Sequence, residues 1–517
     1  MWNPRRMLEF AVRPLRLFAA LLLLLTLAAC TVTRQTQPNV IVVMTDDQPY
    51  GLTAAMPNVQ NLLADRGVRF ENAFATTGLC CPARTTVLRG QYVHNHEVLS
   101  NGGPQGGFPK FYQTGYEAST LATWLQGAGY RTALMGKYLN AYPYGPPEDD
   151  PPDYTAPRDS YIPPGWSEWF GFYDVPKDPN NTPYRMYGYR VNEDGRARWY
   201  GNRADEYQTD VLAERATNFV RQSGRNSTPF FLFLTPTAPH FPTIPAARHI
   251  GRFADLQAPR SPAFNEADTS DKPRWVQAAP RFSEAKVAEL DKVYRRQAEM
   301  LLAVDEMVGA LVETLIGTGE LQNTYIIFTS DQGFHSGEHR LSKMKLTPYA
   351  ATSQIPLIIR GPGVPEGAVR EQLVLNTDLA PTVAGLVGAP VPEFVDGRTL
   401  EPLWQEEAPA WRQTSLAEFW PRRAIEDYGL EHLNVDVTVP TYRAVRSLTH
   451  LFVEYTYLDG TTDGELYDLV NDPFELENLY RRTDPAVIAA FSAHAARLQG
   501  CAARSCREAE DAAPGGL

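Results

Sequence analysis

Residues 78–86 hold the first arrangement that could do chemistry, a cysteine, a proline and an arginine spaced as Cys80-x-Pro82-x-Arg84. The segment lies just ahead of a predicted helix, where unpaired backbone N–H groups and the helix dipole both favour an anion. The sequence therefore predicts that an anionic substrate group binds beside Cys80. The alternative is a buried cysteine pair, Cys80 and Cys81, ahead of an ordinary helix.

Acidic residues follow two apolar runs that are typical of buried strands in a parallel sheet. The run at 40–44 leads to Asp46-Asp47, and the run at 325–330 leads to Asp331-Gln332. Ligands collect at the carboxyl ends of strands in an open α/β sheet, so we expect these oxygen-bearing side chains to meet. One Asp-Asp pair alone would more often be a turn or a helix cap. Two such strand ends predict a site for a divalent cation.

Two further strand patterns end near basic groups. Lys137 follows the run at 131–135, and His240 follows the run at 229–234. A helical pattern precedes each run, which is the repetition expected of βα units. We therefore expect an α/β domain at 39–407, built on a large, mostly parallel central sheet flanked by helices.

The pattern of polar and apolar residues changes from about residue 408. Polar and apolar residues alternate in the segments that follow, which predicts a smaller antiparallel sheet. We assign residues 408–507 to this C-terminal subdomain. The tail at 508–517 is expected to be disordered.

The N-terminus carries arginines ahead of an apolar run at 17–29, a pattern typical of a secretory signal peptide and too short for a membrane span. The run ends in Leu-Ala-Ala-Cys30, which resembles a bacterial lipobox, in which the cysteine is lipidated. We expect residues 1–29 to be a lipoprotein signal peptide and 30–38 a tether. The protein would then be exported and anchored through Cys30 to the outer face of the cell membrane, or to a periplasmic membrane surface. A plain signal peptide is the alternative, and Arg5-Arg6 is a weak hint of twin-arginine export.

Composition bounds the class of protein. A chain of 517 residues with 43% hydrophobic residues is long and apolar enough for a sizeable core. Its formal net charge of -12 argues against a nucleic-acid binder, which would normally show a basic face. We therefore expect no nucleic-acid partner, although a local cationic pocket for an anionic substrate is compatible with this charge.

The segment Cys80–Arg84, followed by Leu88-Arg89-Gly90 and Tyr92–His96, resembles the signature of the type I sulfatases, members of the alkaline phosphatase-like superfamily. Arg89 stands where that family usually has threonine, and the similarity extends from about residue 39 to about residue 480. The resemblance implies that a separate formylglycine-generating enzyme oxidises Cys80 to formylglycine, an aldehyde whose hydrate is the nucleophile. It also implies a large mixed sheet and a sulfate-ester substrate.

The resemblance further implies a role for each charged residue. Calcium would be held by Asp46, Asp47, Cys80, Asp331 and Gln332, with Gln332 standing where asparagine is more usual. Arg84 would hold the modified Cys80, and Lys137 would contact both that group and the sulfate. His240 and Lys345 would bind sulfate and help to protonate the departing alcohol. Lys345 matches the family by its spacing, and Lys343 is the nearby lysine that does not.

One position departs from many arylsulfatases, in which a histidine two positions after the strand-end lysine expels sulfate. That position is Leu139 here, and the sequence looks closer to the glucosamine-6-sulfatase branch. We take His335 as the candidate replacement base, with His94 and His96 as further pocket candidates. A purely structural histidine is the alternative for all three.

The five cysteines leave few candidates for a disulfide. If Cys30 is lipidated and Cys80 is converted, Cys501 and Cys506 remain as the candidates for a disulfide. Cys81 would then be a free and buried thiol.

These observations favour an exported, calcium-dependent sulfatase that acts on a sulfated sugar, such as N-acetylglucosamine 6-sulfate, or on an aryl sulfate. A phosphatase or phosphodiesterase of the same superfamily is one alternative. A non-catalytic lipoprotein that binds sulfated glycans is another.

Overall fold

A computed structural model describes residues 37–143, 160–174, 182–226, 228–404, 410–420 and 438–514. The predicted signal peptide, Cys30 and the predicted boundary at 407/408 lie outside these residues. Among the described residues, none of the helices is both long and apolar enough to cross a membrane.

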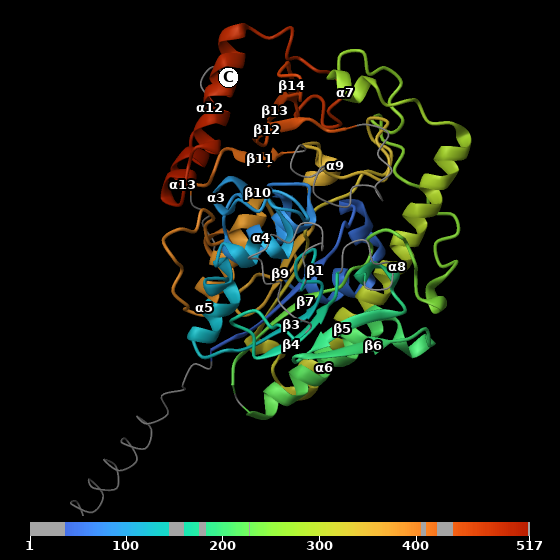
Figure 1. The fold of residues 1–517 in the computed structure, drawn as a ribbon, viewed down its shortest axis with the longest axis vertical. Helices are drawn as coiled ribbons and strands as arrows, with labels where there is room; N and C mark the ends of the chain where they lie inside the picture. Colours follow the sequence, from blue (N-terminus) through green and yellow to red (C-terminus); the bar gives the residue numbers. More distant parts are fainter. Residues whose placement is uncertain are drawn as a thin grey trace, which may run out of the picture. The chain divides into compact units, whose positions relative to one another are not determined.

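The larger sheet has ten strands in the order β10-β2-β9-β8-β1-β7-β3-β4-β5-β6 (Figure 1). Its middle strands, β8, β1, β7, β3 and β4, run parallel, whereas β9, β5 and β6 pair antiparallel to their neighbours. The prediction of a large mixed, mostly parallel sheet is therefore confirmed. The strands are β1 (Asn39–Thr45), β2 (Val68–Phe74), β3 (Arg131–Gly136), β4 (Glu168–Phe172), β5 (Tyr189–Glu193), β6 (Arg196–Tyr200), β7 (Phe230–Thr235), β8 (Thr324–Ser330), β9 (Leu357–Arg360) and β10 (Ala368–Leu375).

Helices cover both faces of this sheet. Alternate residues of β1 enter two different hydrophobic clusters, Val40 and Val42 on one face and Ile41 and Val43 on the other, which explains why the whole strand is apolar. Residues of α6 (Gln208–Asn226) and α8 (Glu284–Thr318) share the cluster of Ile41 and Val43. The opposite cluster takes residues from α2 (Cys80–Arg89), α4 (Gly107–Gln113), α5 (Leu121–Gly127) and α10 (Leu379–Leu386).

The smaller sheet is antiparallel, as predicted, with the order β11-β12-β13-β14. Its strands are β11 (Ser415–Phe419), β12 (Thr441–Arg446), β13 (His450–Thr456) and β14 (Thr462–Asp468). It shares a hydrophobic cluster with α12 (Pro485–Gln499) and with Phe74 and Tyr92 of the first sheet's domain. The described short helices are α3 (Val93–His96), α7 (Arg274–Gln277) and α9 (Ala350–Ser353).

The prediction of a disordered tail from residue 508 is wrong as far as residue 514. The chain continues there as α13 (Arg504–Glu510), and Glu510 is fully buried. Its carboxylate accepts hydrogen bonds from Arg412, Arg398 and Tyr92, and a carboxylate with such partners can be buried. The predicted Cys501–Cys506 disulfide is present; it joins Cys501, ahead of this helix, to Cys506 within it. Cys81 is a buried free thiol, as expected.

Candidate functional site

Polar side chains from four parallel strands meet at their carboxyl ends. Asp46 and Asp47 follow β1, Asp331 follows β8, Lys137 follows β3 and His240 comes shortly after β7. Neighbouring parallel strands end at the same edge of a sheet, so the topology brings these residues together. Cys80 and Arg84 are added by the first turns of α2, and Lys345 by the segment after β8.

The two neighbouring aspartates each bind a different lysine. Asp46 accepts a hydrogen bond from Lys137 Nζ at 2.7 Å, and Asp47 accepts from Lys345 Nζ at 2.7 and 2.8 Å. Nε2 of His240 lies 3.3 Å from Asp47. Asp47 has a φ of 60°, in the left-handed region, and this conformation interrupts the strand alternation that would point the two carboxylates apart.

Arg84 connects Asp331 to Asp46 and Lys137. Its Nε donates to Asp331 at 2.9 Å, its Nη1 donates to the carbonyl of Lys137 at 2.9 Å, and its Nη2 lies 3.6 Å from Asp46. All of these side chains are buried. Burial and the charge of Asp46 raise the pKa of Asp331 above its usual range, and Arg84 opposes that rise.

Cys80 lies at the centre of these charges. It is the first residue of α2, it is fully buried, and its Sγ lies 2.7 Å from Lys345 Nζ and 3.3 Å from Gln332 Nε2. Burial raises the pKa of this thiol to about 12, although Lys137 and Lys345 oppose the rise. Burial also lowers the pKa of His240 to about 4, against the opposing effect of Asp47.

The donor set fits a hard divalent cation. Asp46 Oδ1 and Gln332 Oε1 are buried oxygen atoms that accept no hydrogen bond within the described part of the chain. Ligand atoms of Asp46, Asp47, Cys80 and His240 all lie within 4.8 Å of one another. Carboxylate and amide oxygens are the ligands that Ca²⁺ and Mg²⁺ prefer.

Three predicted histidines make other contacts. Nε2 of His335 lies 2.9 Å from Thr347 Oγ1, and its Nδ1 lies 3.5 Å from Glu338. His94 binds Glu418 and the carbonyl of Cys501. His96 lies 3.1 Å from Thr86 Oγ1. None of these described contacts reaches Cys80, whereas those of His240 reach Asp47.

Tyr184 also lies at this site, although no sequence motif indicated it. The ring of Tyr184, in the short 3-10 helix Pro183–Arg185, stacks on His240 with centroids 4.1 Å apart. Asn140 donates a hydrogen bond to the hydroxyl of Tyr184 at 2.9 Å. Only tertiary structure brings these two segments together, so no local motif could have marked them.

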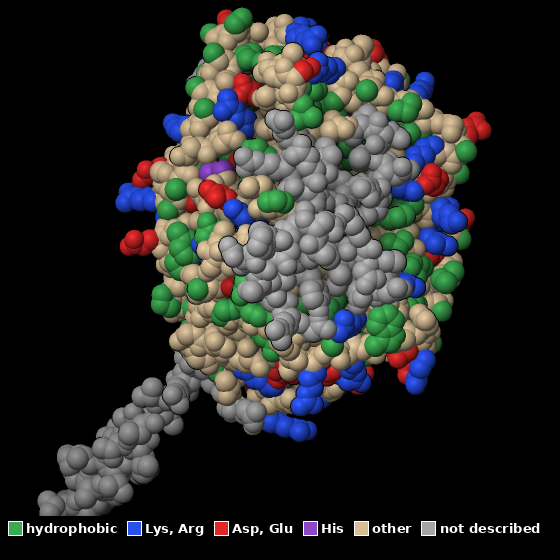
Figure 2. Space-filling view, in the orientation of Figure 1, with side chains coloured by type: hydrophobic (Ala, Val, Ile, Leu, Met, Phe, Trp, Pro, Cys, Tyr) green, Lys and Arg blue, Asp and Glu red, His purple; other side chains and the backbone are tan. Residues whose placement is uncertain are grey.

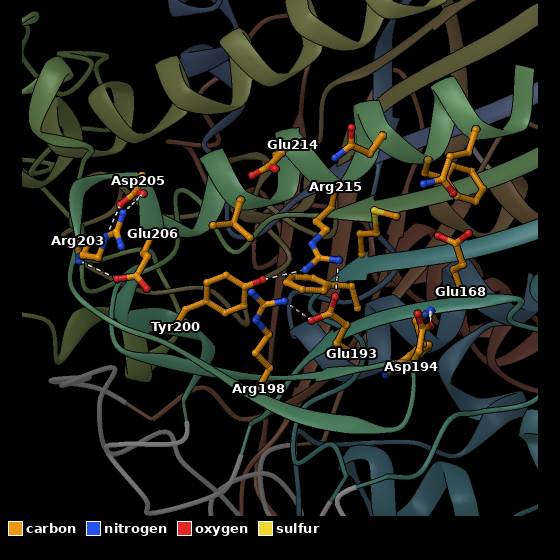
Figure 3. Close-up of a pocket in the computed structure, with 17 residues that line it drawn as sticks. Glu168, Glu193, Asp194, Arg198, Tyr200, Arg203, Asp205, Glu206, Glu214 and Arg215 are labelled. Atoms are coloured by element: carbon orange, nitrogen blue, oxygen red, sulfur yellow. Dashed lines mark hydrogen bonds and ion pairs between the residues drawn. The ribbon is translucent and has the colours of Figure 1, made fainter.

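A cavity of about 490 Å³ lies elsewhere, between α6 and the strands β4, β5 and β6 (Figure 3). The three arginines that line it each pair with an acid of the same cavity, as in Arg198–Glu193 at 3.0 Å and Arg203–Asp205. Among its described lining residues, the cavity therefore offers no arginine without an acidic partner for an anionic substrate group. On the face shown in Figure 2, basic and acidic side chains are interspersed over the described surface.

Comparison with known proteins gives two family matches. The family described as Sulfatase matches residues 38–389. The family described as N-sulphoglucosamine sulphohydrolase, C-terminal, matches residues 337–499.

Curated relatives match over nearly the whole chain. N-acetylglucosamine-6-sulfatase of Homo sapiens is 31% identical, covering 98% of this chain and 93% of the human protein. Arylsulfatase of Volvox carteri is 32% identical, covering 95% of this chain and 79% of the algal protein.

Solved structures share the fold. One protein in complex with its substrate D-glucosamine-2-N,6-O-disulfate has a TM-score of 0.67 at 24% identity, covering 92% of this chain and 99% of its own. A phosphonate monoester hydrolase from Silicibacter pomeroyi has a TM-score of 0.66 at 23% identity, covering 89% and 94%.

Proposed function

The chain belongs to the sulfatase family and is a sulfuric ester hydrolase, and from that premise we propose that its substrate is a sulfated sugar such as N-acetylglucosamine 6-sulfate. The observation that carries the sulfate-ester chemistry is Cys80, the first residue of α2, enclosed by Lys345, Lys137 and two carboxylates, and the choice of a sugar rests on the relatives. The human relative is named for N-acetylglucosamine 6-sulfate, and the algal relative is named an arylsulfatase. An aryl sulfate is therefore the second candidate.

Three basic side chains would neutralise the sulfate. Lys137, Lys345 and His240 lie beside Asp46 and Asp47, and a bound sulfate oxygen placed among them would be stabilised as charge develops in the reaction. We assign His240 the additional role of protonating the departing alcohol, because its ring contacts this cluster. Lys345 would assist it. Burial holds the pKa of His240 low, so the negative charge of the bound sulfate would have to raise that pKa for the ring to carry the proton.

We propose that Cys80 is converted to formylglycine by a separate enzyme and then supplies the nucleophile. Arg84, fixed by Asp331 and by the carbonyl of Lys137, would orient that group. The test is peptide mass spectrometry on protein that turns over sulfate ester, with Cys80→Ala and Cys81→Ala as the matched pair. Cys80→Ala should abolish turnover and Cys81→Ala should retain it. Active protein that carries only unmodified Cys80 would contradict the proposal.

We propose that calcium binds here and supplies positive charge to the sulfate oxygens. The residues that would hold it are Asp46, Asp47, Asp331, Gln332 and the modified Cys80. Adding Ca²⁺ to chelator-treated protein should raise the melting temperature Tm, because a ligand that binds only the folded state stabilises it. Asp331→Ala should lose that shift and the activity. Full activity after exhaustive chelation would contradict the metal site.

We keep His335 as the proposed base for release of sulfate, because Leu139 offers no titratable group at the position that many arylsulfatases use. His335 lies close to Lys345 along the chain, and its backbone N–H donates to the carbonyl of Met344 at 2.8 Å. Its ring would have to leave Thr347 to act on a group at Cys80.

We propose that the protein is exported and lipid-anchored through Cys30, on the strength of the Leu-Ala-Ala-Cys30 sequence. Metabolic labelling with a fatty acid should mark the wild type and not Cys30→Ala. Equal labelling of the two proteins would refute the anchor.

Substrate class is tested with three compounds on one purified, modified protein: N-acetylglucosamine 6-sulfate, 4-nitrophenyl sulfate and 4-nitrophenyl phosphate. We expect turnover of the sulfates with the sugar preferred. Preference for the phosphate would favour the phosphatase alternative. Binding of sulfated glycans without any turnover would favour the non-catalytic one.

A further inference from the structure

Three polar side chains lie beside the anion site on its Lys137 side and have no role in the reaction described above. Asn140 Nδ2 donates to Asp174 Oδ2 at 3.2 Å and to the hydroxyl of Tyr184 at 2.9 Å. The backbone N–H of Ala141 donates to the same oxygen of Asp174 at 3.2 Å. Asn140 thus holds the carboxylate and the phenol in one fixed arrangement.

This group of three, Asn140, Asp174 and Tyr184, adjoins the residues proposed to bind sulfate. The ring of Tyr184 stacks on His240 at 4.1 Å, with 21° between the planes. Nζ of Lys137 lies 5.1 Å from the centroid of the same ring, within the range of a cation–π contact. A molecule whose sulfate reached Lys137 and His240 would therefore bring its remaining part close to this group.

Asp174 and Tyr184 are more exposed than the anion site. Cys80, Lys137 and Lys345 are buried, whereas Asp174 and Tyr184 are only half-buried and so reach solvent. Asn140 is 7% exposed, and its Oδ1 accepts no hydrogen bond from any described residue. A buried amide oxygen without a donor is costly, which points to a donor on the ligand.

The chemistry of the group differs from that of the anion site. A carboxylate and an amide oxygen accept hydrogen bonds from hydroxyl or amide N–H groups, and an aromatic ring offers an apolar face. The carboxylate of Asp174 would repel a second negative charge on the substrate, and an unsubstituted aryl ring would give it no donor. A neutral sugar ring satisfies both requirements.

We propose that Asp174, with Asn140 and Tyr184, binds the alcohol part of the substrate and selects a neutral, hydroxyl-bearing sugar ring. This inference rests on the proposed function, since it concerns the leaving group of the same reaction. It assigns specificity to residues outside the sulfate-binding cluster.

The experiment compares kcat/KM for N-acetylglucosamine 6-sulfate and for 4-nitrophenyl sulfate in the wild type, Asp174→Ala, Asp174→Asn and Tyr184→Phe. A lost hydrogen bond to a charged group should lower kcat/KM for the sugar by about 10- to 100-fold in Asp174→Ala. The value for the aryl sulfate should stay close to that of the wild type, because that substrate has no hydroxyl to bind. Tyr184→Phe keeps the ring on His240 and should show a smaller loss in the same direction.

Glu214→Ala is the matched control, because Glu214 is an exposed acid on α6 and should alter neither substrate. Equal losses on both substrates, or no loss on either, in the folded Asp174 variants would overturn the inference and leave the sulfatase proposal standing. A wild type that hydrolyses only the aryl sulfate would also overturn it. A wild type that hydrolyses neither sulfate would refute the proposed function itself.

Discussion

At the scale of single residues, Lys345 is the cation that touches both an acid and the sulfur of the site. Its Nζ lies 2.7 Å from Asp47 Oδ1 and 2.7 Å from Cys80 Sγ. Lys345→Ala should lower kcat/KM by roughly 10²–10³-fold, the cost of losing one fixed stabilising donor. Steady-state kinetics on purified, modified protein measure this loss.

Lys343 gives that prediction its control. It binds Glu289 and lies over the ring of Phe241, so its charge is used outside the Cys80 cluster. Lys343→Ala should therefore leave kcat/KM close to that of the wild type. Equal losses in the two lysine variants would show that the whole segment, and not the Lys345 charge, is what matters.

The role of His335 is tested by its kinetics. If this ring is the base for the second half-reaction, His335→Ala should release alcohol in a burst and then turn over slowly, because the enzyme stalls with sulfate attached. General-base loss typically costs roughly 10²–10⁴-fold in rate. Rapid-quench measurement of alcohol and sulfate separates the two steps. Near-normal turnover with a lower Tm would make His335 a structural partner of Thr347.

The sequence predicted that the charged residues at strand ends would meet, because the carboxyl ends of parallel strands lie at the same edge of a sheet. It could not say which way a histidine points. His96 faces Thr86 within its own local structure, and His94 faces Glu418 from a strand more than 300 residues later. Asp174 and Tyr184 were missed for a related reason, since only the assembled fold places them beside His240.

At the scale of elements, a part-buried ion pair connects α3 to β11. Nδ1 of His94 lies 2.9 Å from Glu418 Oε1. Burial opposes the charge of His94, yet Glu418 outweighs it and raises the pKa of His94 to about 9. The folded-state pKa thus lies above the unfolded value of 6.5. The pair's stabilisation is fully present below about pH 6.5 and is lost as pH rises through 9.

Thermal unfolding between pH 6 and pH 9.5 tests this pair. The wild type should lose up to about 3 kcal/mol more than His94→Gln over that range, as expected from a raised histidine pKa. His450→Gln is the control, because His450 is half-buried on β13 and binds Thr449. Parallel pH profiles for the wild type and His94→Gln would show that the pair contributes nothing.

Strand positions followed from the continuous apolar runs. The run at 325–330 lies within β8, Thr324–Ser330, and the run at 40–44 is the centre of β1. The same apolar pattern does not predict strand direction, because a short buried strand has the same pattern whether it runs parallel or antiparallel to its neighbours. β9 accordingly pairs antiparallel to both β8 and β2, inside a sheet predicted to be mostly parallel.

At the scale of the whole molecule, the C-terminal helix is tied to the catalytic domain by buried charges. Glu510 accepts from Arg412 Nε at 2.9 Å, and Arg412 also binds Asp378, which lies immediately before α10. Glu510→Ala would leave Arg412 short of a partner in the interior. We expect about 3–5 kcal/mol of lost stability, the usual cost of removing one member of a buried pair.

Chemical denaturation, followed by both activity and circular dichroism, measures this loss. Glu508→Ala is the control, because Glu508 pairs with Arg504 at the surface and such pairs contribute about 0–1 kcal/mol. If Glu510→Ala unfolds at the wild-type denaturant concentration, the tail does not stabilise the domain.

The residues that enclose Cys80 are synthesised long after Cys80 itself. Its contacts Gln332 and Lys345 lie 252 and 265 residues further along the chain, so ribosomes complete the walls of the site long after they have made Cys80. At about 5–20 residues per second, that interval is about 13–50 s. The conversion that we propose must take place while the thiol is still reachable. Under that proposal the maturing enzyme would act on the nascent or unfolded chain, and a molecule that folded before meeting it would stay inactive.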